Sequence, residues 1–481
     1  MKTIPIFPDE FRARMEKLLG EKSWKEFSDA YQIPLKRSLR ANTNLVSRED
    51  FLAMAKRNGW DLSPIPWVDN GFFIDREDHS VALGKTMQHF LGLFYIQEAS
   101  SMAPARALDP QPGETVLDMS SAPGSKTTQM SCLMGNTGLI VANDVSTQRT
   151  KATVTNIERQ ACSNVGITTL DAKMFARLTP NTYDRVLLDA PCSGEGTFTK
   201  ADAFFQRWNG YAIRRMAGIQ RGLIEAAFQT LKPGGTLVYS TCTFAPEENE
   251  EVLDFLLTTF PTNARIEELD GSFGTTEGVT VWEGKMYHPD VARGRRFLPH
   301  VTGTGGFFVA KISKAERTAS DAPPKENGRS KEILVGKKEE AAIREFLVDS
   351  YGTEEEAFGG RVFTRIDDDL WIKPAAYVPL SQNLRFDRCG VQILTVEHGN
   401  RYRLTTAGAR AFGKYFTRNI LPLDEEACKR VAEGRDVRID DEMEAGLSVP
   451  HAVLTTEDGY VLGVGLVRDG NVKNQIPRAL L

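Results

Sequence analysis

The sequence predicts a multidomain α/β protein built around a mostly parallel β-sheet. At 481 residues the chain is too long for a single compact core, so two to four domains are expected. Between about residues 114 and 312, short apolar segments that are typical of strands alternate with helical patterns. This alternation is typical of a parallel sheet that helices cover on both faces. Such sheets bind ligands beyond the carboxyl ends of their strands, so the residues that follow each strand are the candidates for function.

The first predicted region, residues 1–102, precedes this sheet. It begins with an acidic turn and an amphipathic helical pattern, whose apolar positions are Phe11, Met15, Leu18 and Leu19. A basic and polar segment follows, PLKRSLRANTNL, with candidate RNA-contacting side chains at Arg37, Arg40, Asn42 and Asn44. Side chains of these types bond well to phosphates and to base edges. A solvated loop between a helix and a strand explains the segment equally well.

Residues 103–314 form the predicted central domain. The expected strands are Thr115–Met119, Leu139–Asn143, Gly166–Leu170, Tyr183–Leu188, Thr236–Ser240, a segment near Ala264–Glu268, and Gly306–Ile312. The expected helices between them are Lys126–Leu133, Thr147–Gln160, Ala212–Thr230 and Pro246–Phe260. The strands are short and apolar, as buried parallel strands are.

Three further regions follow the central domain. Residues 315–332 lack apolar periodicity and contain a Pro pair, which is typical of a linker. Residues 333–388 mix helix and strand patterns, and residues 389–481 are rich in strands punctuated by Gly. We expect this last region to form a small β-barrel of a kind that often docks RNA, although a purely structural module has the same composition.

Composition and charge limit the classes of function. Apolar residues make up 41% of the chain, which excludes wholesale disorder. The net charge of -5 argues against non-specific binding to polyanions, but residues 1–60 hold 12 Lys/Arg against 8 Asp/Glu. A local basic excess on an acidic protein fits a specific nucleic-acid partner, and a solvated surface would look the same.

The sequence also indicates where the protein works. No apolar run approaches the ~18 residues that a membrane span requires. Asp9 and Glu10 lie where a signal peptide would need apolar residues. Six cysteines without CxxC spacing predict neither a disulfide framework nor a zinc site. We therefore expect a cytoplasmic protein with no membrane attachment and no bound metal.

A loop of small residues, DMSSAPGSKTT, follows the first strand of the central domain and opens a helix. It is neither a P-loop, which needs Gly directly before Lys, nor the dinucleotide fingerprint GxGxxG. Pro123 and Gly124 let a ligand approach the backbone, and the amides at the helix N-terminus favour a carboxylate. Asp144 after the second strand suits a ribose diol, and Asp171 after the third suits an adenine amino group. Together these groups describe S-adenosylmethionine, although each Asp taken singly could be a helix N-cap.

Two cysteines, Cys192 and Cys242, follow the fourth and fifth strands. Cysteine at a strand end is more often a small buried filler than a nucleophile. In the common methyltransferase strand order, however, the fourth strand lies between the first and fifth, so both cysteines would face one cleft. A thiolate there could add to carbon 6 of cytosine and make carbon 5 able to accept a methyl group, while Asp189 faces ring nitrogen 3. The spacing allows either cysteine to be the nucleophile.

Three motifs, DMSSAPGSKT, LLDAPCSGEG and YSTCTFAPEENE, together resemble those of the Nol/Nop/Sun-type RNA cytosine-5 methyltransferases. The resemblance covers about residues 114–312 and implies an S-adenosylmethionine-dependent, Rossmann-like methyltransferase core. It implies that the cofactor contacts Ser120, Ser121, Ala122, Pro123, Gly124, Ser125, Lys126, Asp144, Asp171 and Asp189. It makes Cys242 the nucleophile and Cys192 the helper that releases the methylated base, whereas DNA cytosine-5 methyltransferases attack with the cysteine of the Pro-Cys pair. Ser120-Ser121 replaces the usual Ala-Ala, a small-for-small change that we expect the cofactor site to tolerate.

The resemblance extends more weakly to both ends of the chain. SLRANTNL is similar to the RNA-binding region of that family, and residues 389–481 resemble its RNA-docking PUA-like domain. We therefore expect a monomeric enzyme that methylates carbon 5 of cytosine in RNA, with small-subunit (16S) rRNA or the small ribosomal subunit as its partner. The alternatives are the same chemistry on tRNA or another rRNA site, and an inactive RNA-binding assembly factor. The presence of both cysteines and all the cofactor-site acids argues against the inactive factor.

Overall fold

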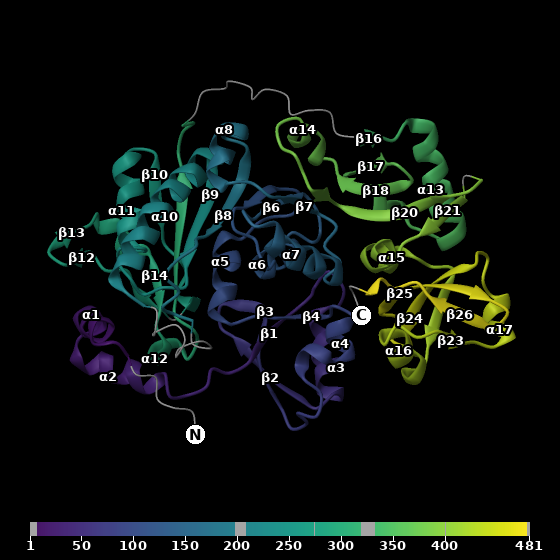
Figure 1. The fold of residues 1–481 in the computed structure, drawn as a ribbon, viewed down its shortest axis with the longest axis horizontal. Coiled ribbons are helices and arrows are strands. Elements are labelled where there is room, and N and C mark those ends of the chain that lie inside the picture. The colour runs from purple at the N-terminus through teal and green to yellow at the C-terminus, as the bar shows by residue number, and fades with distance from the viewer. Residues whose placement is uncertain (1–6, 198–207, 274, 319–331, 400, 479–481) are drawn as a thin grey trace.

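The computed structural model describes residues 7–197, 208–273, 275–318, 332–399 and 401–478. The chain runs from an N-terminal helical pair, through a long central sheet, to two further β-sheets at the C-terminal side (Figure 1). Most of the predicted linker, residues 315–332, lies outside the described residues.

The N-terminal part consists of the helical pair and a small antiparallel sheet. The pair is α1 (Asp9–Leu19) and α2 (Glu21–Ala30). The sheet has the order β2-β3-β1-β4, formed by β1 (Ser38–Ala41), β2 (Trp60–Ile65), β3 (Val68–Arg76) and β4 (Phe94–Ile96). The short helices of this part are α3 (Arg48–Arg57) and α4 (Met87–Phe90). The predicted amphipathic helix is present, with Phe11 and Met15 buried.

The polar segment that the sequence offered as an RNA contact or a solvated loop is buried. Arg40, Asn42 and Asn44 are each at most 7% exposed. Arg40 Nη2 donates to Thr128 Oγ1 at 3.0 Å, and Asn42 donates to two backbone carbonyl oxygens at 2.9 and 3.0 Å. Both alternatives are therefore wrong for these three residues, which join the N-terminal sheet to the central domain. Arg37, in the same segment, is exposed.

The central sheet contains the parallel strands that the sequence predicts. Its order is β11-β14-β15-β9-β8-β5-β6-β7-β19, with β10 paired to β15. The strands are β5 (Thr115–Asp118), β6 (Leu139–Asn143), β7 (Val165–Thr168), β8 (Tyr183–Asp189), β9 (Leu231–Thr241), β10 (Ala264–Glu267), β11 (Thr276–Glu277), β14 (Arg295–Phe297), β15 (Phe307–Lys314) and β19 (Arg388–Cys389). The run β9-β8-β5-β6-β7 is parallel, and β15 pairs antiparallel with β9. The fourth predicted strand, β8, therefore lies between the first, β5, and the fifth, β9, as expected.

Helices cover both faces of this sheet (Figure 1). One face packs against α5 (Ala103–Leu108), α6 (Ser125–Leu133) and α7 (Thr147–Arg159). The other packs against α8 (Phe175–Leu178), α10 (Gly210–Thr230) and α11 (Glu250–Thr259). Alternate residues of one strand point to opposite faces, so that Val116 joins one apolar cluster and Leu117 the other. The α/β fold class predicted from the sequence is confirmed.

Two five-stranded sheets form the C-terminal part, which is β-rich as predicted. The first has the order β16-β17-β18-β20-β21, formed by β16 (Ile333–Leu334), β17 (Arg361–Ile366), β18 (Asp369–Pro374), β20 (Val391–Glu397) and β21 (Arg401–Leu404). The second has the order β22-β24-β25-β26-β23, formed by β22 (Ile420–Leu423), β23 (Val437–Arg438), β24 (His451–Thr456), β25 (Val461–Arg468) and β26 (Asn471–Asn474). Helices α13 (Lys337–Tyr351), α14 (Tyr377–Ser381), α15 (Thr406–Phe412), α16 (Glu425–Ala432) and α17 (Asp441–Ala445) accompany them.

The boundary predicted after residue 388 runs through the first of these sheets, because β18 on one side pairs with β20 on the other. At the same boundary, β19 pairs antiparallel with β7 and extends the central sheet. The C-terminal part is thus attached to the central domain through a shared sheet. Over the described ranges, no helix is long and apolar enough to cross a membrane, and no group of three His, Cys, Asp or Glu could hold a metal.

Candidate active site

Two thiols meet at the carboxyl ends of β8 and β9. The two strands are parallel neighbours with Asp189 opposite Ser240, so the segments that follow them run side by side. Cys242 directly follows β9, Cys192 follows β8, and their Sγ atoms lie 3.3 Å apart. Both cysteines are free thiols. The structure thus brings together the two cysteines that the sequence placed at one edge of the sheet.

The surroundings of the two thiols differ. The hydrogen bond with Cys192 lowers the pKa of the Cys242 thiol, and Thr197 and Lys126 act in the same direction against the effects of burial and of the Asp189 carboxylate. Thr197 Oγ1 lies 3.8 Å from Cys242 Sγ. The same bond to Cys242, together with burial and the Glu248 carboxylate, raises the pKa of Cys192. A thiolate therefore forms more readily on Cys242 than on Cys192.

Asp189, the last residue of β8, is held on both carboxylate oxygens. Its Oδ2 accepts from Lys126 Nζ at 2.7 Å, and its Oδ1 accepts from Ser240 Oγ at 2.8 Å. Lys126 also donates to Ser101 Oγ at 3.1 Å. Burial alone would lower the pKa of Lys126, but the neighbouring Asp189 raises it. Lys126 therefore remains a cation that links the predicted cofactor loop to Asp189.

The predicted cofactor loop, Ser120 to Lys126, follows β5 and includes the first two residues of α6. Ser121 N donates to Asn143 O at 2.7 Å, and Gly124, with φ 99°, precedes the helix. No side chain caps this end of α6, and the buried Ser121 hydroxyl has no hydrogen-bond partner among the described residues. Small residues, an uncapped helix N-terminus and an unsatisfied buried hydroxyl fit the carboxylate-bearing end of S-adenosylmethionine.

The two acids predicted for the rest of the cofactor lie in different surroundings. Asp144 is 2% exposed, and its Oδ2 lies 3.2 Å from Arg149 Nη1. Arg149 also donates to Ala122 O at 2.9 Å, so Asp144 and the loop share one guanidinium. Asp171 is exposed and caps the short 3-10 helix Ala172–Met174. The N-cap role that the sequence left open is therefore present at Asp171.

Two buried carboxylates beside the thiols escaped the sequence analysis. Glu195 accepts from Trp208 Nε1 at 2.8 Å and from Phe244 N at 3.0 Å. Glu248 accepts from Ser193 N at 2.9 Å. Burial raises the pKa of both carboxyl groups, that of Glu248 to about 7.

The composition of the sequence around Glu248 does not indicate a buried carboxylate. In the sequence, PEENE has the composition of an exposed, acidic first helical turn, and the helix was expected to begin at Pro246. In the structure α11 begins at Glu250, because the preceding turn is held to the thiol segments. Asn249, for example, accepts from Thr241 Oγ1 at 2.6 Å. Spacing alone could not have revealed these partners.

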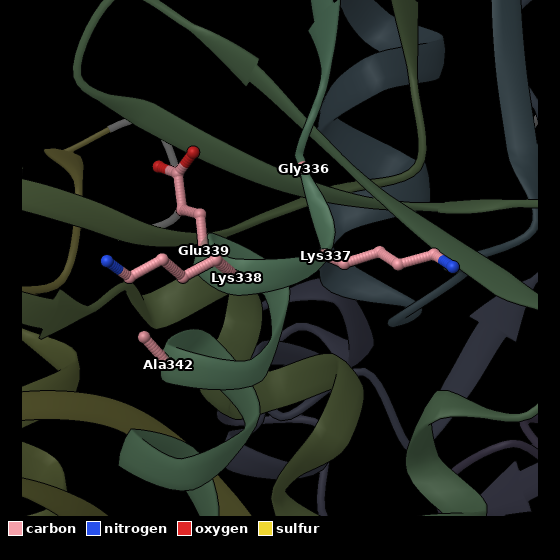
Figure 2. A pocket seen from close by; sticks show the side chains of 5 residues that line it. All are labelled: Gly336, Lys337, Lys338, Glu339 and Ala342. Carbon is pink, nitrogen blue, oxygen red and sulfur yellow. The ribbon is translucent and has the colours of Figure 1, made fainter.

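A separate hollow of about 510 Å³ lies at the N-terminus of α13. It is lined by Gly336, Lys337, Lys338, Glu339 and Ala342 (Figure 2). The two lysine side chains point in opposite directions and do not converge on a ligand (Figure 2). None of the predicted site residues lines this hollow.

Two protein-family descriptions match the chain. The description "16S rRNA methyltransferase RsmB/F" matches residues 105–313. The description "N-terminal domain of 16S rRNA methyltransferase RsmF" matches residues 7–99. The first range contains both cysteines, Asp189 and the whole predicted cofactor loop.

Similar proteins extend over nearly the whole chain. The chain is 38% identical over 477 residues to ribosomal RNA small subunit methyltransferase F of Vibrio parahaemolyticus, covering 98% of this chain and 97% of that protein. It is 37% identical over 486 residues to the protein of that name from Aeromonas salmonicida, with the same two shares.

Solved structures resemble the larger part of the chain. A methyltransferase homologue from Pyrococcus horikoshii is 36% identical with a TM-score of 0.58, covering 64% of this chain and 95% of that one. NSun6 from the same organism, solved with SFG, is 25% identical with a TM-score of 0.55, covering 65% of this chain and 100% of that one.

Proposed function

The chain belongs to the RsmB/F family of 16S rRNA methyltransferases, and we propose that it transfers a methyl group from S-adenosylmethionine to carbon 5 of a cytosine in 16S rRNA. The resemblance to the Nol/Nop/Sun-type enzymes, and among them to bacterial RsmF, is confirmed. The chain is therefore an enzyme, an RNA methyltransferase. The observation that carries the proposed chemistry is the 3.3 Å approach of the Cys192 and Cys242 thiols at the ends of two parallel strands.

The proposed cofactor, S-adenosylmethionine, supplies an electrophilic methyl group when it is bound. Its use is supported by NSun6, which was solved with SFG, an analogue of this cofactor. In the proposal, the loop Ser120 to Lys126 holds the methionine end of the cofactor, and Asp144 bonds to the ribose. Asp171 bonds to the adenine, and Asp189 closes the site on the side of the thiols.

The proposed nucleophile is Cys242, because its surroundings favour the thiolate. Its sulfur forms a bond to carbon 6 of the cytosine, and carbon 5 becomes enamine-like and able to accept the methyl group. The Asp189 carboxyl group faces ring nitrogen 3 and shares a proton with that nitrogen as electron density collects there, and Lys126 balances the carboxylate that remains. When carbon 5 then loses its proton to a base, the bond between sulfur and carbon 6 breaks and the thiolate leaves. Cys192, whose pKa is raised and which therefore keeps its proton more firmly, assists this release by passing that proton to the departing Cys242 sulfur.

The partner in the proposal is RNA, in 16S rRNA or the small ribosomal subunit, and the enzyme acts in the cytoplasm as a monomer. A cytosine must leave its stack to reach thiols at the end of a sheet. We therefore expect an accessible loop or an assembly intermediate as the substrate.

The roles of the two thiols are tested by single substitutions. Cys242→Ala should abolish methyl transfer, and Cys192→Ala should leave a covalent protein–RNA adduct that migrates slowly on a denaturing gel. Cys428→Ala is the matched control, because Cys428 is a buried free thiol on α16, outside the site. An adduct that accumulates in Cys242→Ala instead would reverse the two roles.

The substrate is tested by bisulfite sequencing of rRNA and tRNA from cells with and without the gene. The expected result is the loss of 5-methylcytosine at a 16S rRNA position. A loss confined to tRNA or to another rRNA would show that this RNA, and not 16S rRNA, is the substrate. No change at any cytosine would contradict the proposed reaction.

A further inference from the structure

A buried glutamate clamps both sides of Cys192. The Glu248 side chain is fully buried, and its Oε2 accepts from Ser193 N and from Gln220 Nε2, each at 2.9 Å. The same Gln220 amide nitrogen donates its second hydrogen to Pro191 O at 2.8 Å. Both peptide groups that flank Cys192 are therefore fixed by the Gln220–Glu248 pair, which we call the clamp.

A second set of bonds ties this clamp to the segment that carries Cys242. Thr243 Oγ1 lies 2.8 Å from Ser193 Oγ and 3.4 Å from Glu248 Oε1. It donates to Glu195 Oε2 at 2.9 Å. The neighbours of both thiols, Ser193 and Thr243, thus meet at the Glu248 carboxyl group, and Thr243 also bonds to Glu195. Gly196 N donates to Cys242 O at 2.8 Å and holds only the far end of the Cys192 loop.

We propose that Glu248 is a positioning residue of the methyl-transfer reaction, which holds the Cys192 thiol against Cys242 so that Cys192 can assist release. The proposal rests on the proposed function, since it assumes that Cys192 acts in release. Glu248 acts through the Cys192 loop, because over the described residues its side chain bonds to Ser193, Gln220 and Thr243 and to neither thiol. Loss of the clamp should therefore affect Cys192 more than Cys242, which directly follows the last residue of β9.

The protonation state of Glu248 indicates which substitution would preserve its hydrogen bonds. Burial is the main cause that raises the pKa of Glu248 to about 7, and Glu195 adds to it. The other ionisable groups that face Glu248 are Cys192, whose pKa it raises, and Tyr239, whose hydroxyl donates to Glu248 O at 2.5 Å. Near neutral pH a large fraction of Glu248 is a neutral acid, so a neutral amide can reproduce its hydrogen bonds. Glu248→Gln keeps the acceptor for Ser193 N and Gln220 Nε2, whereas Glu248→Ala removes it.

The juxtaposition of the two thiols can be tested without cofactor or RNA by the rate at which they form a disulfide. Diamide takes two hydrogen atoms from two adjacent thiols, forming a disulfide and a hydrazine, and mass spectrometry identifies the Cys192–Cys242 peptide. We expect Glu248→Ala to slow this crosslink by about tenfold to a hundredfold, because ångström displacements of reacting groups have effects of that size. Glu248→Gln should crosslink at nearly the rate of the unsubstituted enzyme.

The matched control is Glu247→Ala, in the adjacent residue. The Glu247 carboxylate pairs with Arg14 at 2.7 Å, on the side of α1. This variant should lose stability without a change in the crosslinking rate. With 16S rRNA and S-adenosylmethionine, Glu248→Ala should accumulate the covalent adduct as Cys192→Ala does, and Glu248→Gln should not.

The outcomes separate the two proposals. Equal crosslinking in Glu248→Ala and the unsubstituted enzyme would overturn the positioning role. So would an equal slowing in Glu247→Ala, because it would mean general loosening of the turn. If the crosslinking rates follow the expectation but no variant or parent enzyme methylates RNA, the clamp stands and the proposed function fails.

Discussion

Substitution of Arg40 and Arg37, one at a time, would separate a buried structural contact from an exposed RNA contact. Arg40 donates to Gln97 Oε1 at 3.2 Å, to Thr128 Oγ1 at 3.0 Å and to Cys132 Sγ at 3.3 Å. Arg37 lies in the same basic segment but is exposed. We expect Arg40→Ala to destabilise the fold, and Arg37→Ala to weaken RNA binding without a change in stability.

The size of the Arg40→Ala effect follows from which partners stay satisfied. The Thr128 hydroxyl and the Cys132 thiol keep hydrogen bonds of their own. Gln97 Oε1 accepts from Arg40 and, over the described residues, from no other side chain. An interior acceptor left without a donor costs about 1–3 kcal/mol, and the buried stem of the arginine adds about 1–2 kcal/mol. The expected loss in the free energy of unfolding is about 2–5 kcal/mol, or roughly 2–5 °C in Tm for a 481-residue chain that unfolds as one unit.

Thermal unfolding monitored by circular dichroism measures the loss of stability in Arg40→Ala. Fluorescence anisotropy with a 16S rRNA fragment over a series of salt concentrations measures the loss of RNA affinity in Arg37→Ala. Loss of one phosphate contact in Arg37→Ala should reduce the slope of log K against log salt by about 0.7–0.9. If Arg40→Ala unfolds at the parent temperature yet binds RNA more weakly, the reasoning that places Arg40 in a structural contact is refuted.

Two further predictions concern charged pairs. Lys126→Met should raise the pKa of Cys242, because the substitution removes a cation that lowers this pKa and leaves the Asp189 carboxylate without its counter-charge. The pH midpoint of iodoacetamide alkylation at Cys242 should therefore move upward. An unchanged midpoint would contradict this prediction. Arg296→Met should lower the free energy of unfolding by about 3–5 kcal/mol, because it leaves the fully buried Glu250 carboxylate without its partner at 2.7 Å. Denaturant unfolding measures that loss, and the double variant with Glu250→Met should recover part of it.

Much of the central domain could be predicted because buried parallel strands have a strong local signature. Leu139–Asn143 is apolar over most of its length, lies buried throughout, and forms β6 within its predicted bounds. The known preference for one strand order then placed β8 between β5 and β9. From those two steps, Cys192 and Cys242 were expected at one edge, where their sulfurs lie 3.3 Å apart.

Prediction failed where the decisive partner lies far away in the chain. Arg40 has the same local context as an RNA-binding arginine, and partners far along the chain, among them Thr128, 88 residues later, make it a buried contact. The boundary after residue 388 failed for a similar reason, because strands on its two sides pair with each other. Asp171 shows a different limit, since the same position after a strand suits both a helix N-cap and a ligand.

The division of labour between the thiols is the point at which the structure adds most to the sequence. Spacing allowed either cysteine to be the nucleophile, and only the family resemblance favoured Cys242. The surroundings of the pair support the same proposed assignment. The mutual hydrogen bond is the largest cause that lowers the pKa of Cys242, and Thr197 and Lys126 lower it further against burial and Asp189; the same bond, burial and Glu248 raise the pKa of Cys192. A pair in which one thiol gives up its proton and the other keeps it is what successive attack and release require.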